Sequence, residues 1–393
     1  MLVVVVVLGA LGGLAAIRLS GGPPVATVTA ALSKTKVLPG SAPAPPWPAG
    51  VQAAFSIPAL GVSSESGPEH SVPVASLTKT MTAYIILTDH PLAANDQGPS
   101  LTMTAADVAD WDNAVDTDQS NVQVAVGEVL SERQLLEGLL VHSANNFADT
   151  LAEWDAGSVA AFVVKMNATA HRLGMTDSHF VDPSGYSAQS QSTPADLLKV
   201  IRLDMEFPVF EQTVTMPSVI LPVAGTVASA TPLVGLPGIV GVKSGFTSAA
   251  GGCDVLALLD RVDGQLVVVL AAVTGEQQGD EPVEVAGQAA LAIAKFVGGE
   301  VVGVPLVHQG SVVARATVGG TSIPAVAVAS EALLGWPGQV IRAHFTPAKP
   351  PSAGAPAGRL VGRATFRVAS EQATVGIRTL RALPMPTVLQ RLL

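Results

Sequence analysis

The stretch ASLTKTMTAY, residues 75–84, places a serine three positions before a lysine at the head of an apolar segment. In a helix, Ser76 and Lys79 lie on one face a turn apart, so the hydroxyl and the amine can meet. A serine hydroxyl is a weak nucleophile until a base removes its proton, and a buried lysine can be that base if its pKa falls toward neutrality. A capping serine followed by a surface lysine explains the same letters, so the pair needs support from elsewhere in the chain.

Two further stretches supply that support. Residues 143–145, Ser-Ala-Asn, follow the apolar pattern of a predicted helix, and residues 243–245, Lys-Ser-Gly, lie in a run with the composition of a strand. Taken singly, the first is typical of a turn between helices and the second of an edge strand protected by a lysine. Together, in this order and on these elements, they match the S-x-x-K, S-D-N and K-T-G combination of penicillin-binding proteins and class A β-lactamases.

The chain therefore resembles this superfamily, and more specifically the D-alanyl-D-alanine carboxypeptidases, which are low-molecular-weight penicillin-binding proteins. The segments SANNFADTLAE, FVDPSGY and VGVKSGFTSAAGG are similar to successive blocks of that family, over roughly residues 51–297. The resemblance implies an α+β fold. We expect a β-lactamase/transpeptidase-like domain, with an antiparallel sheet flanked by helices and an all-helical lobe, and a smaller C-terminal all-β domain.

The resemblance also implies roles for individual residues. Ser76 is the acylated nucleophile, and Lys79 takes its proton. Ser143 relays a proton to the leaving D-alanine, while Asn145 holds the substrate amide and Lys79. The backbone N–H groups of Ser76 and Phe246 form the oxyanion hole.

A second set of residues is expected to bind substrate. Lys243 contributes positive charge beside the site, and Ser244 and Thr247 hydrogen-bond the terminal carboxylate. Gly245 lets the substrate backbone approach the strand edge and pair with it. Ser244 stands where threonine is commoner in the family, which keeps the hydroxyl.

Local signals predict several elements. Ser131 with Gln134 is typical of a capped helix start, and Asp263-Gly264 between two apolar runs is a hairpin turn signal. A last helix is expected over roughly residues 284–297, and a long loop over residues 347–358 inside the C-terminal module.

The N-terminal region is expected to direct the chain to the cell envelope. The uncharged run MLVVVVVLGALGGLAAI predicts a signal peptide or a membrane anchor within residues 1–30, and a cut after Ala30 would suit small-residue cleavage. Residues 31–50, rich in proline toward their end, are assigned to a linker. The predicted catalytic domain then spans residues 51–299 and the β-rich domain residues 300–393. Both interpretations, a signal peptide and a membrane anchor, place these domains outside the cytoplasm.

Composition excludes some classes of partner and cofactor. The formal net charge is -10 with no block of lysine and arginine, which argues against nucleic acid. Cys253 is the only cysteine and the seven histidines show no metal-binding spacing, so no cofactor or metal is expected. The low charged content, 13%, with 48% hydrophobic residues still fits a globular chain.

The predicted function is a serine carboxypeptidase that removes the terminal D-alanine from peptidoglycan stem pentapeptides through an acyl-enzyme, with β-lactams as covalent inhibitors. One alternative is a β-lactamase-like hydrolase. Class A enzymes of that kind use a glutamate between the second and third motifs, and this chain has none between Glu153 and Glu206. The other alternative is a catalytically silent cell-wall-binding homologue, which would have no chemical reason to keep all of the motif residues.

Overall fold

The computed structural model describes residues 22–387, which divide into two compact units. One unit spans Pro43–Glu300, and the other combines the described residues before and after it, 22–42 and 301–387. Of the predicted targeting segment, residues 1–30, residues 1–21 lie outside the described residues. In the part of the chain that the structure describes, no helix is both long and apolar enough to cross a membrane.

The Pro43–Glu300 unit is built on a five-stranded antiparallel sheet with strand order β11-β12-β13-β3-β4. Its strands are β3 (Gln52–Ile57), β4 (Val62–Glu65), β11 (Ile239–Thr247), β12 (Gly251–Val262) and β13 (Gln265–Glu276). Asp263 and Gly264 join β12 to β13 with φ of 50° and 81°, the left-handed pair of a tight hairpin turn, so the predicted turn is confirmed. Strand β11, which carries Lys243, lies at one edge of the sheet.

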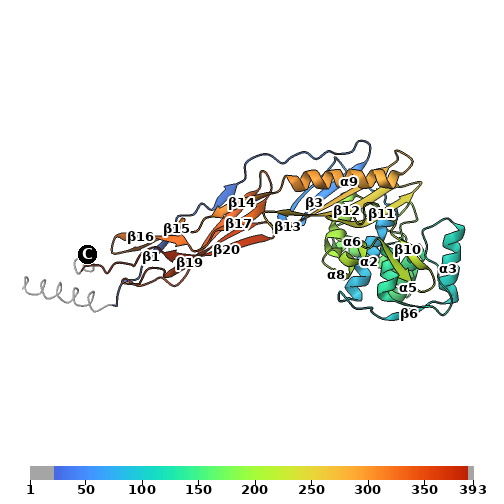
Figure 1. The fold of residues 1–393 in the computed structure, drawn as a ribbon, viewed down its shortest axis with the longest axis horizontal. Coiled ribbons are helices and arrows are strands. Elements are labelled where there is room, and N and C mark those ends of the chain that lie inside the picture. Colours follow the sequence, from blue (N-terminus) through green and yellow to red (C-terminus); the bar gives the residue numbers. More distant parts are fainter. Residues whose placement is uncertain (1–21, 388–393) are drawn as a thin grey trace, which may run out of the picture. The chain divides into compact units, whose positions relative to one another are not determined.

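Helices cover both faces of this sheet. Helix α9 (Pro282–Gly299) packs along one face, and the other helices lie on the opposite side (Figure 1). They are α2 (Thr78–Asp89), α3 (Ala105–Asp116), α4 (Glu132–Leu140), α5 (Asn145–Ala156), α6 (Val159–Arg172), α7 (Pro194–Asp204) and α8 (Pro208–Val214). Helix α4 begins with the predicted capping box, in which Ser131 Oγ accepts from Gln134 N and Gln134 Oε1 from Ser131 N.

Helix α2 is the centre of the core. Nine of its twelve residues are buried, on all of its faces, which is the pattern of a helix enclosed by other elements. Phenylalanines from three neighbouring segments, Phe147, Phe162 and Phe210, belong to the same hydrophobic cluster as Met81. This packing places Lys79, in the first turn of α2, inside the protein.

Short strand pairs complete the unit: β5 (Val72–Pro73) with β8 (Gln191–Ser192), β6 (Ser100–Thr102) with β7 (Val129–Ser131), and β9 (Ser218–Leu221) with β10 (Gly225–Ala228).

The second unit is all β. Its seven-stranded sheet has the order β1-β15-β16-β20-β19-β18-β2, and β14 (Val302–Val307) pairs separately with β17 (Glu331–Gly335). The central strands are β15 (Val312–Val318), β16 (Thr321–Ala327), β18 (Val340–Pro347), β19 (Leu360–Val368) and β20 (Glu371–Thr379). An α+β unit with a smaller all-β unit confirms the predicted fold class.

The structure differs from the sequence expectation in the N-terminal region. Residues Thr27–Ala30, expected in a leader or anchor, form β1 and pair with β15. Residues Thr35–Val37, expected in a linker, form β2 and pair with β18. These strands are short and their partners lie about 300 residues further along the chain, so no local pattern reveals the pairing.

Candidate active site

The three motif segments meet beside the edge strand β11. Ser76 lies in a 3-10 turn, Ala75–Leu77, directly before α2, and Asn145 is the first residue of α5. Lys79 Nζ is 2.9 Å from Ser76 Oγ and 2.6 Å from Asn145 Oδ1. Gly245 on β11 lies so close that a Cβ there would come 2.6 Å from Ser76 N. The predicted juxtaposition of these segments is therefore present in the structure.

The turn that carries Ser76 has an unusual backbone. Ala75 adopts φ 46°, a left-handed conformation that is costly for a residue with a Cβ. The α-helix begins at Thr78, so Ser76 lies in the turn before the helix and not within it. Strained residues of this kind persist where the surrounding structure holds them, and they concentrate at functional sites.

Lys79 is fully buried and has three hydrogen-bond partners. Besides Ser76 Oγ and Asn145 Oδ1, its Nζ donates to the backbone carbonyl of Ser184 at 2.9 Å. Burial lowers the pKa of Lys79 well below its ordinary value, and the charge of Lys243 lowers it further, against an opposing effect of Asp182. A neutral amine in contact with a serine hydroxyl is the arrangement that a general base requires.

Lys243 is the second buried lysine of the site. Its Nζ donates to Ser244 O at 2.9 Å, and Ser244 Oγ donates to Ala230 O at 2.8 Å. Burial lowers the pKa of Lys243 to about 7, opposed by the carboxyl of Asp254 on the neighbouring strand. Ser244 is directly opposite Asp254 in the ladder. The Asp254 carboxyl therefore lies on the strand behind the edge strand β11.

Ser143 occupies the turn between α4 and α5. It has φ 69° and is buried, and its Oγ has no hydrogen-bond partner among the described residues. An unpaired buried hydroxyl is costly unless a ligand, a proton acceptor or water completes it. Asn145, two residues on, is held by its backbone N–H, which donates to Ser120 O at 2.8 Å.

A cleft of about 540 Å³ opens onto Ser76. The predicted residues that line it are Ser76, Asn145, Phe246 and Thr247. The other five lie outside its lining and are buried or lie on the buried part of β11: Lys79, Ser143, Lys243, Ser244 and Gly245. Phe246 is 55% exposed at the rim. The arrangement is a serine at the surface of a groove with its basic groups behind it.

Sequence reasoning missed the loop that holds Lys79 from the far side. The carbonyl of Ser184 binds Lys79, and Asp182 folds this loop by accepting hydrogen bonds from the backbone N–H groups of Ser184, Gly185 and Ser187. The segment FVDPSGY carries the signal of a turn, Asp-Pro-Ser-Gly, but a contact made by a backbone carbonyl has no side-chain signature.

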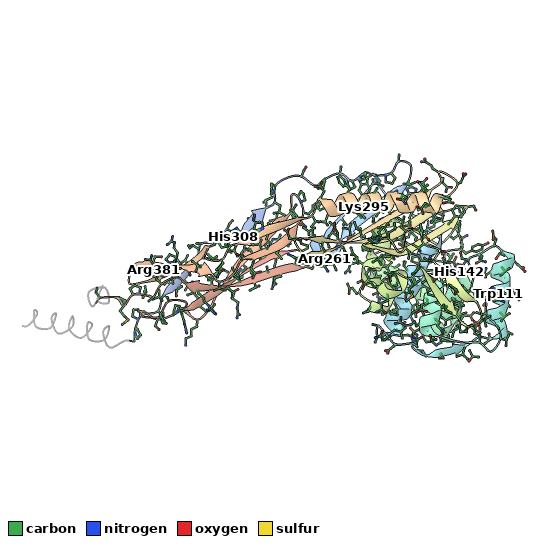
Figure 2. All side chains as sticks on the ribbon, in the orientation of Figure 1. Trp111, His142, Arg261, Lys295, His308 and Arg381 are labelled. Carbon is green, nitrogen blue, oxygen red and sulfur yellow. The ribbon has the colours of Figure 1, made fainter. Side chains whose placement is uncertain are left out.

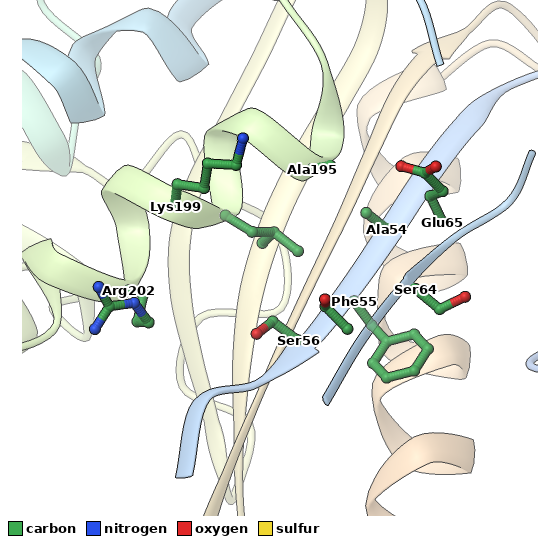
Figure 3. Close-up of a pocket in the computed structure, with 10 residues that line it drawn as sticks. Ala54, Phe55, Ser56, Ser64, Glu65, Ala195, Lys199 and Arg202 are labelled. Atoms are coloured by element: carbon green, nitrogen blue, oxygen red, sulfur yellow. The ribbon is translucent and has the colours of Figure 1, made fainter. Parts of the chain in front are cut away.

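A second pocket, of about 480 Å³, lies between β3, β4 and α7 (Figure 3). Its cations are already paired: Lys199 with Asp196 at 2.7 Å and Arg202 with Glu206 at 3.2 Å. None of the predicted site residues lines it. The cleft at Ser76 is therefore the candidate active site.

This fold and this motif geometry are those of a low-molecular-weight penicillin-binding protein. The family model described as D-alanyl-D-alanine carboxypeptidase matches residues 62–274, more than half of the chain, and the chain belongs to that family.

Individual relatives agree. The chain is 32% identical over 216 residues to a D-alanyl-D-alanine endopeptidase of Pseudomonas aeruginosa, covering 51% of this chain and 64% of the relative. It is 33% identical over 218 residues to the D-alanyl-D-alanine carboxypeptidase DacB2 of Mycobacterium tuberculosis, covering 54% of this chain and 70% of the relative. The crystal structure of penicillin binding protein 6B from Escherichia coli superposes with a TM-score of 0.60 at 22% identity, over 86% of this chain and 98% of that one. The last similarity shows the fold alone.

Proposed function

We propose that the chain is a serine DD-carboxypeptidase that removes the terminal D-alanine from peptidoglycan stem pentapeptides through an acyl-enzyme. The observation that carries the proposal is Lys79 Nζ, fully buried and 2.9 Å from Ser76 Oγ. Substrates of this kind place the enzyme outside the cytoplasm, in the cell envelope, and the N-terminal segment would either anchor it to the membrane or be removed on secretion.

The proposed acylation step begins at the Ser76 hydroxyl. Neutral Lys79 takes the proton, and Oγ attacks the carbonyl carbon of the bond between the two D-alanines. The backbone N–H groups of Ser76 and Phe246 would stabilise the oxyanion. Ser143, whose buried hydroxyl has no partner among the described residues, would pass a proton to the departing D-alanine amine. Water then hydrolyses the acyl-enzyme.

Recognition of the substrate would fall to β11. The charge of Lys243 and the hydroxyls of Ser244 and Thr247 suit the terminal carboxylate. The absence of a side chain at Gly245 lets the turn that carries Ser76 lie against β11. A peptide would pair with the edge of this strand. A β-lactam presents the same carboxylate and a strained amide, so it would acylate Ser76 and inhibit the enzyme.

An endopeptidase is a second candidate activity, because the relative from Pseudomonas aeruginosa carries that name. It uses the same acylation chemistry on a cross-linked peptide. β-Lactam hydrolysis is disfavoured by the lack of a glutamate between Glu153 and Glu206.

Labelling with a fluorescent penicillin tests the proposal. We expect covalent labelling of the wild type, none of Ser76→Ala, and full labelling of Ser63→Ala, a control in β4 at the opposite edge of the sheet. Persistent labelling of Ser76→Ala would refute the assignment of the nucleophile. Release of D-alanine from a pentapeptide, compared with cleavage of a cross-linked peptide dimer and of a chromogenic cephalosporin, separates the three activities.

A further inference from the structure

The direction of the Lys79 lone pair depends on which end of the Asn145 amide faces it. A neutral amine has two N–H donors and one lone pair. Lys79 Nζ donates to the carbonyl of Ser184 and to Asn145 Oδ1, and it lies 2.9 Å from Ser76 Oγ. If the neutral amine keeps the first two bonds, its lone pair is left to accept from the hydroxyl of Ser76. If the amide turned over, its NH2 would compete with Ser76 for that lone pair. The orientation of Asn145 therefore decides whether Lys79 can act on Ser76.

A chain of hydrogen bonds outside the motifs fixes this orientation. Asn145 Nδ2 donates to Gln119 Oε1 at 2.6 Å, and Gln119 Nε2 donates to Thr117 Oγ1 at 2.8 Å. The Thr117 hydroxyl in turn donates to the backbone carbonyl of Asn113 at 2.6 Å. The carbonyl oxygen of Asn113 can only accept, so the Thr117 hydroxyl must donate to it and accept from Gln119. Gln119 therefore presents its NH2 to Thr117 and its Oε1 to Asn145, and Oε1 can only accept from the Asn145 NH2.

The segment that carries Gln119 is anchored to α3. Asn121 Nδ2 donates to the carbonyl of Gln119 at 2.8 Å, and Trp111 Nε1 donates to Asn121 Oδ1 at 2.9 Å. Trp111 belongs to α3, at the outer side of the unit (Figure 2). The loop is thus held at its backbone as well as through the Gln119 side chain, and it forms one wall of the cleft at Ser76.

We propose that Gln119 and Thr117 are positioning residues that set the polarity of Asn145 and, through it, aim the Lys79 lone pair at Ser76. The proposal rests on the proposed acylation of Ser76. Gln119 is half-buried and contacts Asn145 directly, whereas Thr117 is exposed, where water can replace its hydroxyl. Gln119 should therefore matter more than Thr117.

The test measures the second-order rate of penicillin acylation from pH 5 to 10 in the full chain. Gln119→Met removes the acceptor at similar length, and we expect an acylation rate about tenfold lower at every pH, the effect of roughly one lost hydrogen bond. Gln119→Glu keeps an acceptor for Asn145, and its charge favours protonated Lys79. We therefore expect a near wild-type plateau, with the acid limb displaced to higher pH.

Matched variants separate positioning from simple damage. Thr117→Val should lower the acylation rate about threefold. Thr117→Ser keeps the hydroxyl and should acylate at the wild-type rate. Gln123→Met, an exposed glutamine four residues further on, is the control and should leave the rate unchanged. Melting temperatures show whether each variant folds. If Gln119→Met does not fold, the acylation rates of Thr117→Val and Thr117→Ser and the pH profile of Gln119→Glu test the positioning role.

The outcomes distinguish this proposal from the proposed function. If the wild type is not labelled, or Ser76→Ala still is, the acylation chemistry is wrong and the positioning role falls with it. If acylation is normal in the wild type but Gln119→Met retains its full rate, the positioning role alone is refuted. Equal losses in Gln119→Met and Gln119→Glu with unchanged pH profiles would also refute it.

Discussion

Lys79 and Lys243 show how burial acts on single residues, and at Lys79 a like charge adds to its effect. Both side chains are fully buried, and desolvation is the largest cause of the lowered pKa in each. Asp254, also buried, has a pKa raised well above its ordinary value by desolvation, with Lys243 opposing. Burial therefore disfavours the charged form of each of these three groups.

Glu132 gives a stability prediction at the same scale. It begins α4, is fully buried, and neither carboxylate oxygen has a hydrogen-bond partner among the described residues. Burial raises the pKa of Glu132 from 4.5 to about 7. Because the folded pKa lies above the unfolded one, Glu132 binds its proton more tightly in the folded state. Its contribution to the free energy of unfolding is complete below pH 4.5 and is lost as the pH rises to about 7.

We therefore expect Glu132→Leu to raise the free energy of unfolding at pH 8 by roughly 1–3 kcal/mol, the cost of an unpaired buried polar group. The gain should shrink toward pH 4.5. Urea unfolding of both proteins at several pH values measures it, with Glu211→Leu as an exposed control. A gain that is independent of pH would contradict the buried ionisation of Glu132.

The residues of the site divide by what the sequence can reveal. Ser76, Lys79, Asn145 and Lys243 could be singled out because they belong to three motifs whose combination resembles that of a known family. Gln119 could not, since its role comes from a hydrogen bond to Asn145, 26 residues further along, and no motif marks such a contact. Assigned roles such as the proton relay by Ser143 stay predictions.

At the scale of elements, the loop after α6 is fitted tightly against the turn that carries Ser76. Gly185 has φ 78°, and a Cβ there would overlap the carbonyl oxygen of Ala75. Only glycine fits both the left-handed backbone and this close approach. The loop also supplies the Ser184 carbonyl to Lys79, so any shift of Gly185 would reach Lys79.

Gly185→Ala should consequently abolish penicillin labelling or lower its rate by at least about a hundredfold, roughly 3 kcal/mol in the barrier. Gly174→Ala is the matched control, because Gly174 has φ 71° and no atom within 4 Å of an added Cβ. It should cost only about 1 kcal/mol of stability and leave labelling intact. Labelling of Gly185→Ala at the same rate as Gly174→Ala would contradict the role of the close contact with Ala75.

Elements with local signals were predicted well. The capping box of α4 and the hairpin at Asp263-Gly264 depend on residues close together in sequence, and both are confirmed. Helix α9 extends two residues beyond its predicted range at each end. The 3-10 turn that precedes α2 was not foreseen, because the strained φ of Ala75 is imposed by packing against distant segments.

At the scale of the whole molecule, the all-β unit depends on a segment from the other end of the chain. Strands β1 and β2 form the two edges of its seven-stranded sheet. Unpaired edges invite aggregation, so these strands protect β15 and β18. Sequence patterns revealed the central strands but not their edge partners, because register over such a separation is set by tertiary packing.

Removal of β1 alone tests this role and bears on processing of the leader. A chain that begins at residue 31, as a cut after Ala30 would leave it, lacks β1 but keeps β2. Relative to a chain beginning at residue 22, we expect faster amide hydrogen exchange in β15, where Ala314–Thr317 lose their partners, and a greater tendency to aggregate. Amides of β18, still paired with β2, serve as the internal control. Unchanged exchange in β15 would mean that β1 contributes nothing to the sheet, and a mature chain starting at Ala31 would then be structurally acceptable.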